Sequence, residues 1–198
     1  MTHHSELLNR LIAAHGYKSY LEIGTFNRSH NFDKINAEIK ECVDPDPVAN
    51  ATYQCTSDYF FETINNLDAE DGGGQTFDLI FVDGLHHAEQ VEKDIKNAYA
   101  ALTPRGMIVV HDSNPPTEQT TCVPRGSQRE WCGDVYKAIS RIVSPKLTLD
   151  FDYGCCVILK SFDLKFSDRS VDWKTFDANR RDLLGLATVD DGSRQLGI

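Results

Sequence analysis

Hydrophobic residues recur along the chain in helix-like and strand-like patterns that alternate with each other. Residues 6–15 carry Leu and Ile at helical spacing, and Gly16 follows as a residue that suits the end of a helix. Residues 20–24 then form a short apolar run, which predicts a buried strand that enters a turn. The chain therefore begins with a helix followed by a strand.

The next part of the chain is more polar, and its elements are predicted from shorter signals. We expect a helix over 32–39, a second strand that ends at 42–44, and a third strand over 51–55. Ser57 or Asp58 is placed to cap a helix that runs to Leu67. The glycine-rich stretch 71–74 predicts a flexible surface loop.

The clearest pattern lies between residues 77 and 112. Residues 77–83 are almost continuously apolar, which is typical of a strand buried on both faces. Residues 89–102 carry one apolar helical stripe, 104–106 predict a turn, and 107–110 predict another buried strand that ends in His111-Asp112. Strand, helix and strand in this order predict a parallel βαβ unit.

The last part of the chain mixes a loop, helices and a hairpin. Residues 113–131 form a long polar segment, which in a compact domain is usually functional or disordered. We then expect a helix over 135–143, a hairpin whose strands 148–152 and 155–160 flank the turn 153–154, and a last helix within 173–184. Residues 190–198 show no clear pattern and are expected to be frayed.

The alternation of strands and helices predicts an α/β fold, an open, doubly wound and mostly parallel sheet with helices on both faces and an antiparallel hairpin near the end. With 198 residues and no linker, the chain is expected to be one domain over 1–198, with a core at about 17–160 and a helical extension over 161–198. Such sheets bind ligands at the carboxyl ends of their strands.

Composition and charge exclude several classes of protein. The net charge is −10, which is unfavourable for nucleic acid or an anionic membrane because both require clustered Lys and Arg. We find no run long enough for a membrane span and no pattern of a signal peptide, so a cytoplasmic location is expected. The six cysteines form no CxxC pair, and free thiols are the expected state; Cys122 and Cys132 are the one pair that could form a bridge.

Four acidic residues stand where predicted strands end: Glu22, Asp44, Asp83 and Asp112. Any one of them could be a solvated strand end or a helix cap. All four at one edge of the sheet favour a binding cleft, because the carboxyl ends of parallel strands meet there.

Gly24 permits close approach of the backbone to a ligand, and Asp44 lies 22 residues after Glu22, a spacing at which an acid can accept both hydroxyls of an adenosine ribose. The segment after Gly24 lacks the later glycines of GxGxxG. A pyrophosphate needs those glycines, so their absence disfavours NAD and is compatible with an adenosine ligand without phosphate, such as S-adenosylmethionine.

The chain also resembles a known family in four segments: LEIGT (21–25), VDPDP (43–47), FDLIFVDGLHHAEQVEKDI (77–95) and LTPRGMIVVHDSNP (102–115). These are similar to the class I S-adenosylmethionine-dependent methyltransferases, and among them to the small O-methyltransferase-like group with a VDG-x-H signature (methyltransferase domain family 24 type). The resemblance implies a Rossmann-like sheet of seven strands, S-adenosylmethionine as cofactor, and O-methylation of a small-molecule or sugar hydroxyl. It departs from the family at 27–30, where another glycine is common.

The resemblance also implies roles for individual residues. Glu22 and Gly24, with Thr25, would line the methionine and ribose end of the cofactor; Asp44, with Pro45, would hold the ribose; Asp58 would meet the adenine; and Asp83 would lie near the reactive methyl group.

His86 is the candidate general base, with Asp83 as its partner and Asp112 nearby, because an imidazole has a pKa suited to proton removal. It could instead cap the following helix. A second reading is a metal site, in which Asp83, Asp112 and Asn114 bind Mg²⁺ or another divalent cation that anchors the acceptor hydroxyl.

The segment 114–131 is the expected acceptor wall, where Arg125, Arg129 and Trp131 could bind a polar or anionic substrate or simply lie in a solvated loop. Two other functions remain open, a non-catalytic S-adenosylmethionine-binding protein and a nicotinamide-dependent oxidoreductase. No nucleic-acid or membrane partner is expected, and a homodimer is compatible with the sequence.

Overall fold

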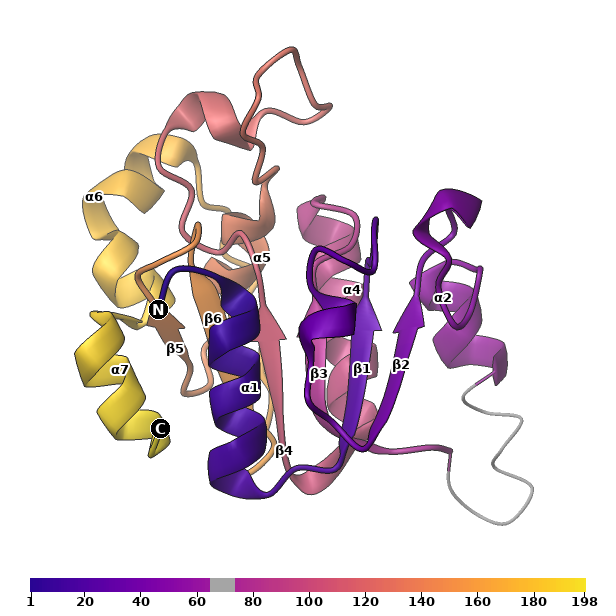
Figure 1. Ribbon diagram of the computed structural model, residues 1–198. Coiled ribbons are helices and arrows are strands. Elements are labelled where there is room, and N and C mark those ends of the chain that lie inside the picture. Colours follow the sequence, from indigo (N-terminus) through magenta and orange to yellow (C-terminus); the bar gives the residue numbers. More distant parts are fainter. Residues whose placement is uncertain (65–73) are drawn as a thin grey trace.

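The fold is a three-layer α/β sandwich, seen in a computed structural model that describes residues 1–64 and 74–198 (Figure 1). Helices cover both faces of a central sheet, and both termini lie beside α7 at one side of the molecule. Most of the predicted loop 71–74 and the last residues of the predicted helix 57–67 lie outside the described residues.

The sheet has seven strands within the described residues, in the order β2-β1-β3-β4-β6-β5-β7. Strands β2, β1, β3 and β4 are parallel, β6 is antiparallel to both β4 and β5, and β7 pairs with β5 in parallel. Their bounds are β1 Ser19–Ile23, β2 Ile39–Val43, β3 Phe77–Val82, β4 Leu102–Val110, β5 Leu147–Leu149, β6 Cys155–Leu159 and β7 Leu186–Ala187. The expected seven-stranded, mostly parallel sheet with an antiparallel hairpin is therefore confirmed.

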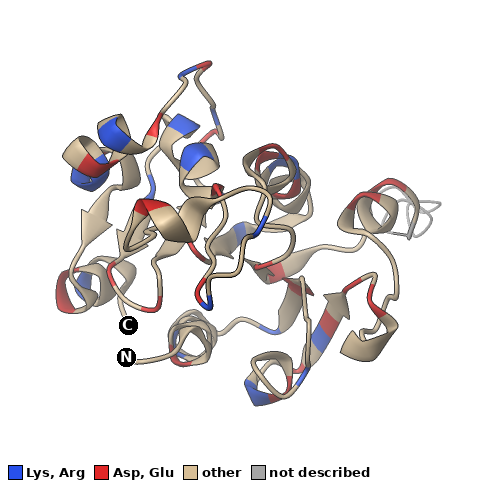
Figure 2. Cartoon of the chain, turned by 90° about the horizontal axis from the view of Figure 1, so that it is seen from above, with Lys and Arg blue, Asp and Glu red and all other residues tan. Residues whose placement is uncertain are grey.

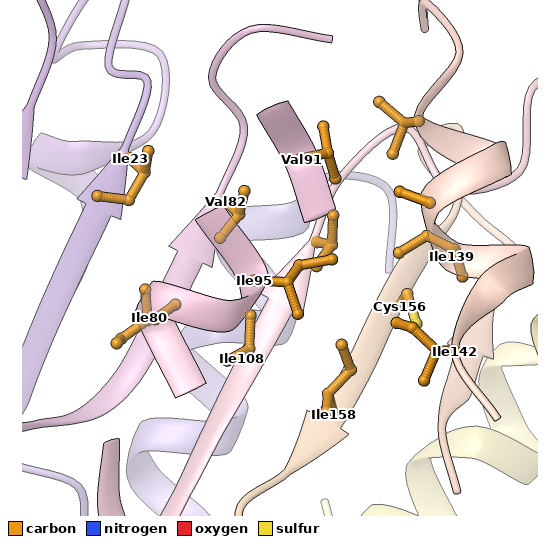
Figure 3. Packing of buried hydrophobic residues seen from close by; sticks show 14 of the residues in the cluster. Ile23, Ile80, Val82, Val91, Ile95, Ile108, Ile139, Ile142, Cys156 and Ile158 are labelled. Atoms are coloured by element: carbon orange, nitrogen blue, oxygen red, sulfur yellow. The ribbon is translucent and has the colours of Figure 1, made fainter. Parts of the chain in front are cut away.

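One face of the sheet is covered by α4 (Ala88–Ala100), α5 (Val135–Arg141) and α6 (Trp173–Leu184). Figure 3 shows this core, in which Val91 and Ile95 of α4 pack over Ile80 and Ile108 of the central strands. The other face is covered by α1 (His4–His15), the 3-10 helix η1 (Phe32–Lys34) and α7 (Val189–Leu196). The continuous apolar runs of β3 and β4 follow from this burial on both faces.

The strongest sequence signals gave the correct elements. Helix α1 ends at Gly16, whose left-handed backbone (φ 65°) is the conformation that glycine adopts without strain. The βαβ unit is confirmed as β3, α4 and β4, and the hairpin as β5 and β6.

Two early predictions were wrong, and both concern the connections around β2. Residues 32–39 form only the short η1, since Ile35 is already extended and Ile39 begins β2. The loop after β1 uses the residues before Phe32, so few residues remain to reach the start of β2. An extended chain covers about 3.3 Å per residue and a helix only about 1.5 Å, so the extended conformation spans this distance with fewer residues. Residues 51–55 form no strand; only Tyr53 bridges to Val43.

Three further boundaries differ from the sequence prediction. Thr56, rather than Ser57 or Asp58, caps α2 (Ser57–Tyr59), which continues as the π-helix η3 (Phe60–Ile64). The predicted turn 104–106 lies inside β4, where the register with β3 shifts. Residues 190–198, expected to be frayed, belong mostly to α7, which Thr188 and Gly197 cap.

The C-terminal segment therefore contributes to the sheet as well as to the helical layers, since β7 extends the edge beside β5. All six cysteines are free, Cys122 and Cys132 among them. No helix of the described residues combines the length and apolar character of a membrane span.

Candidate functional site

A large cavity of about 990 Å³ opens at the carboxyl ends of the parallel strands, the edge seen from above in Figure 2. This volume is near the upper end of the roughly 300–1,000 Å³ range of ligand pockets. Ten of the residues predicted from the sequence line it: Gly24, Asp44, Pro45, Asp58, Asp83, His86, Asp112, Arg125, Arg129 and Trp131. The switch between β1 and β3 thus holds a cavity where open α/β sheets bind ligands.

A smaller cavity of about 270 Å³ adjoins the large one on the side of α1. The two share the lining residues Gly24, Phe26 and Asp83. The small cavity is also lined by predicted Glu22 and Thr25 and by residues that the sequence prediction did not include: His3, His4, His30, Asn31 and Lys34. One elongated ligand could therefore occupy both cavities.

Gly24 is required at the junction of the cavities. Its φ is +85°, and a Cβ atom there would lie 2.3 Å from the carbonyl oxygen of Asp83. Loop 24–31 can therefore lie against the loop after β3 only because residue 24 has no side chain.

Asp44 fixes the conformation of the loop after β1. Its Oδ2 accepts hydrogen bonds from the backbone N–H groups of Thr25 (2.9 Å) and Phe26 (2.8 Å), and its Oδ1 accepts one from Asp46 (2.8 Å). A carboxylate has about four acceptor positions, so the chain itself leaves about one for a ligand. Asp44 thus has a structural role that the sequence prediction did not include, and it has room for one ligand hydroxyl rather than two.

A polar network lines the far end of the large cavity. The Gln90 amide donates to Asp58 Oδ1 (3.0 Å) and Asp94 Oδ1 (3.0 Å), and the Ser57 hydroxyl donates to Asp94 (2.6 Å). Burial raises the pKa of Asp94 to about 6, whereas the hydrogen bond from Lys93 lowers the pKa of Asp58. Asp58 is thus an ionised acceptor held in place at the cavity wall, as its predicted role requires.

Glu22 lies on the floor of the small cavity and is 1% exposed. Its carboxylate accepts hydrogen bonds from the Tyr20 hydroxyl (2.6 Å) and the Asn31 amide (2.5 Å). Burial raises the pKa of Glu22 to about 7 in spite of these donors.

Two buried acceptor atoms of the small cavity have no partner within the described structure, Thr25 Oγ1 and Asn31 Oδ1. Buried polar atoms are rarely left without a hydrogen bond. At the rim, His3 Nδ1 accepts from the Ser5 amide (3.1 Å), so the neutral ring carries its proton on Nε2 and offers a donor. Lys34 adds a positive charge. The small cavity therefore combines acceptors on its floor with donors at its rim.

The centre of the large cavity holds an alternating cluster of acids and histidines. His86 Nε2 lies 3.4 Å from Asp83 Oδ1, and His86 Nδ1 lies 3.3 Å from Asp112 Oδ2. His111 Nδ1 lies 3.2 Å from Asp83 Oδ1 and 3.5 Å from Asp112 Oδ2. The structure thus brings together the three predicted catalytic residues and adds His111, which was not among the predicted catalytic residues.

The cluster strongly perturbs its own pKa values. Burial alone would lower the pKa of His86 and His111, but the carboxylates of Asp83 and Asp112 outweigh it and raise both. The two histidines in turn hold the pKa of Asp83 below its usual range, against the effect of burial. The acidic side chains therefore favour the protonated form of both histidines.

A further pair connects this cluster to the N-terminus of the chain. Asp152 Oδ2 lies 3.6 Å from His111 Nε2 and accepts from the backbone N–H of His4 (2.7 Å), with His4 Nδ1 at 2.8 Å. Nothing in the local sequence indicated these contacts, since 148 residues separate His4 from Asp152.

Two of the three predicted metal ligands, Asp83 and Asp112, lie together with His86. Ligand atoms of Asp83, His86 and Asp112 all lie within 4.8 Å of one another, close enough to bind one cation. Asn114 is not brought to them: its amide donates to Asp150 (2.9 Å), its oxygen accepts from Arg180 (2.8 Å), and it does not line either cavity. The donor set in place is two carboxylates and one imidazole.

Comparison with known proteins identifies the family of the chain. The model of a methyltransferase domain family matches residues 7–113, which include β1 to β4 and most of the cavity lining. Among proteins of curated function, none matches the chain at a significant level.

Solved structures share the fold at low identity. A candidate O-methyltransferase from Klebsiella pneumoniae is 17% identical, with a TM-score of 0.52 over 78% of each chain. A candidate caffeoyl-CoA O-methyltransferase from Staphylococcus aureus is 16% identical, with a TM-score of 0.51 over 80% of this chain and 83% of the other. At these identities the likeness establishes the fold alone.

Proposed function

This chain belongs to a methyltransferase domain family, and we propose that it transfers a methyl group from S-adenosylmethionine to a hydroxyl group of a small molecule or sugar. The observation that carries the proposal is the pair of adjoining cavities at the carboxyl ends of β1, β2 and β3. Together they offer a polar wall for adenine, the carboxylate of Asp44 for the ribose, and a small polar chamber for an amino acid.

The small cavity fits the amino-acid end of S-adenosylmethionine. An α-ammonium group needs acceptors, and Glu22, Thr25 Oγ1 and Asn31 Oδ1 supply them. An α-carboxylate needs donors, and His3 and Lys34 supply them at the rim.

The large cavity fits the rest of the cofactor and an acceptor. Asp58 and Gln90 can bind the adenine amino group and ring edge, and Asp44 can accept from one ribose hydroxyl. The acids Asp83 and Asp112 lie where a positive charge is stabilised.

When bound, S-adenosylmethionine supplies an activated methyl group on a positively charged sulfur, and its transfer to a hydroxyl leaves one proton to be removed. His86 is the group on this chain that takes the proton, because it lines the cavity between Asp83 and Asp112. Its raised pKa favours the protonated form, whereas only the neutral imidazole can take up a proton. The positive charge of a bound cofactor beside the same carboxylates would lower the pKa of His86 and so favour the neutral imidazole.

Metal-assisted chemistry is the alternative at the same place. A divalent cation bound by Asp83, His86 and Asp112 would anchor an acceptor hydroxyl and lower its pKa. His111 competes with this reading, because an imidazolium 3.2 Å from Asp83 already neutralises the carboxylates.

A labelled methyl donor tests the proposal directly. The protein is incubated with S-[methyl-³H]adenosylmethionine and a panel of phenols, sugars and hydroxy acids, and label in the acceptor is measured. Transfer to a hydroxyl compound supports the proposal. If S-adenosylhomocysteine binds but no acceptor is labelled, the chain is a non-catalytic binding protein. If NAD binds instead, an oxidoreductase is favoured.

A cytoplasmic location and a homodimer remain predictions from the sequence.

A further inference from the structure

The segment 117–134 forms one wall of the large cavity, and the loop that carries Asp83 and His86 holds it in place. The backbone N–H of Asp134 donates to His86 O (3.0 Å), and the Asp134 carboxylate accepts from the N–H of Ala88 (2.7 Å) at the start of α4. Gly133 (φ +57°) packs so closely that a Cβ atom would lie 2.0 Å from His86 O. The end of this wall at 133–134 is therefore held beside the loop that carries the acid–histidine cluster.

Trp131 anchors the outer part of the wall. Its indole ring stacks on His86 with ring centroids 4.9 Å apart, and its Nε1 donates to Cys122 O (2.6 Å). The Arg125 guanidinium lies 5.5 Å from the centre of the Trp131 ring and donates to Arg129 O (3.3 Å). Arg125 and Arg129 both line the cavity.

These two arginines form no ion pair with an acidic residue in the described part of the chain, although acidic residues outnumber basic ones by 30 to 20. Four other arginines do pair with carboxylates: Arg28, Arg141, Arg180 and Arg194. Glu130 follows Arg129 directly in sequence, but it contacts Tyr153, whose pKa is raised by burial and by its hydrogen bond to Glu130. Arg125 and Arg129 thus keep their guanidinium donors available at the cavity.

The cavity is divided by charge. Five of its six acids lie away from the wall: Asp44, Asp83 and Asp112 follow strands, and Asp58 and Asp94 lie on α2 and α4. Both of its arginines lie on the wall, where Glu130 is the sixth acid and contacts Tyr153. An anionic group is repelled by the acids and attracted by the guanidinium groups, whose planar donors suit carboxylate and phosphate oxygens.

We propose that the acceptor carries an oxyanion, a carboxylate or a phosphate, that Arg125 and Arg129 bind while its hydroxyl group lies at Asp83 and His86. This inference rests on the proposed function and adds the chemical class of the acceptor. The arginines are specificity-determining residues and take no part in the transfer itself.

Matched pairs of hydroxyl compounds test the inference on the protein saturated with S-adenosylhomocysteine. The pairs are 4-hydroxybenzoate with 4-hydroxybenzamide, glycerate with glyceramide, and glycerol 3-phosphate with glycerol, each titrated by calorimetry. In at least one pair the anion should bind about tenfold more tightly than its neutral partner. The pair that responds distinguishes a carboxylate from a phosphate.

The double variant Arg125→Ala/Arg129→Ala should lose this preference and still bind S-adenosylhomocysteine as the wild type does. The control variant Arg10→Ala/Arg169→Ala removes two exposed arginines that line neither cavity, and it should keep the preference. The inference is overturned if no anion is preferred, or if the double variant keeps the preference. Failure of S-adenosylhomocysteine itself to bind would count against the proposed function instead.

Discussion

Replacement of Glu22 by Gln is expected to stabilise the fold at neutral pH. Burial raises the pKa of Glu22 from 4.5 to about 7, so the folded protein keeps a proton there that the unfolded chain releases. Between these two values the folded state binds more protons, and its stability falls as the pH rises. A difference of about 2.5 in pKa corresponds to about 3 kcal/mol, the full cost of an ionised Glu22 above pH 7.

Gln avoids this cost because it does not ionise, while its oxygen can still accept from Tyr20 and Asn31. Urea unfolding measures the free energy of unfolding of both proteins from pH 4 to pH 8. The advantage of Glu22→Gln over the wild type should grow by about 3 kcal/mol across this range and level off above pH 7. Glu89→Gln, at an exposed position on α4, serves as the control.

A constant difference between Glu22→Gln and the wild type at all pH values, or a difference that falls as the pH rises, would refute this reasoning. The variant should also bind S-adenosylhomocysteine more weakly, because an ammonium group loses its charged acceptor, and should bind 5′-methylthioadenosine, which has no amino-acid end, as the wild type does. A gain in stability together with a loss of binding is the expected sign of a residue retained for function.

Three further predictions concern the large cavity. Asp44→Ala should weaken binding of S-adenosylhomocysteine about 10- to 100-fold in calorimetry, the worth of a charged hydrogen bond. Binding of 5′-methylthioadenosine should weaken too, since it carries the ribose, and unchanged binding of 5′-methylthioadenosine would remove Asp44 from the ribose role. His86→Gln should lower kcat about 10²- to 10⁴-fold, and it should abolish the rise of kcat/KM with pH through a pKa above 6.5. The control His87→Gln should have neither effect. A His86→Gln enzyme that is as active as the wild type would exclude His86 as the base. EDTA should leave methyl transfer unchanged, and a loss that Mg²⁺ restores would favour the metal reading.

The elements that the sequence predicted well are those whose patterns arise from burial. The apolar runs of β3 and β4 exist because helices cover both faces of the sheet, and the stripe of α4 exists because one side packs on it. Helix α7 was missed because it contributes few apolar residues: it packs through Gly192 against Leu149 and through Leu196. A helix that packs through a glycine lacks the hydrophobic periodicity from which helices are predicted.

The sequence predicted the part of the site whose residues are brought together by the order of the strands in the sheet. Asp83 and Asp112 follow adjacent parallel strands, so their proximity needs no other information. Asp152 and His4 meet only through the tertiary fold, and no local pattern could indicate this. Asn114 was expected at the site because it follows Asp112 closely, but the left-handed backbone of Asp112 (φ 56°) turns the chain, and Asn114 bonds to Asp150 and Arg180 instead.

The central claim is that the two adjoining cavities bind S-adenosylmethionine, and titration of the protein with S-adenosylhomocysteine by calorimetry tests it most directly. We expect one molecule to bind per chain, with 5′-methylthioadenosine binding at least tenfold more weakly because it leaves the small cavity empty, and with no binding of NAD. Absence of heat with S-adenosylhomocysteine at millimolar concentration, or tighter binding of NAD, would contradict the account.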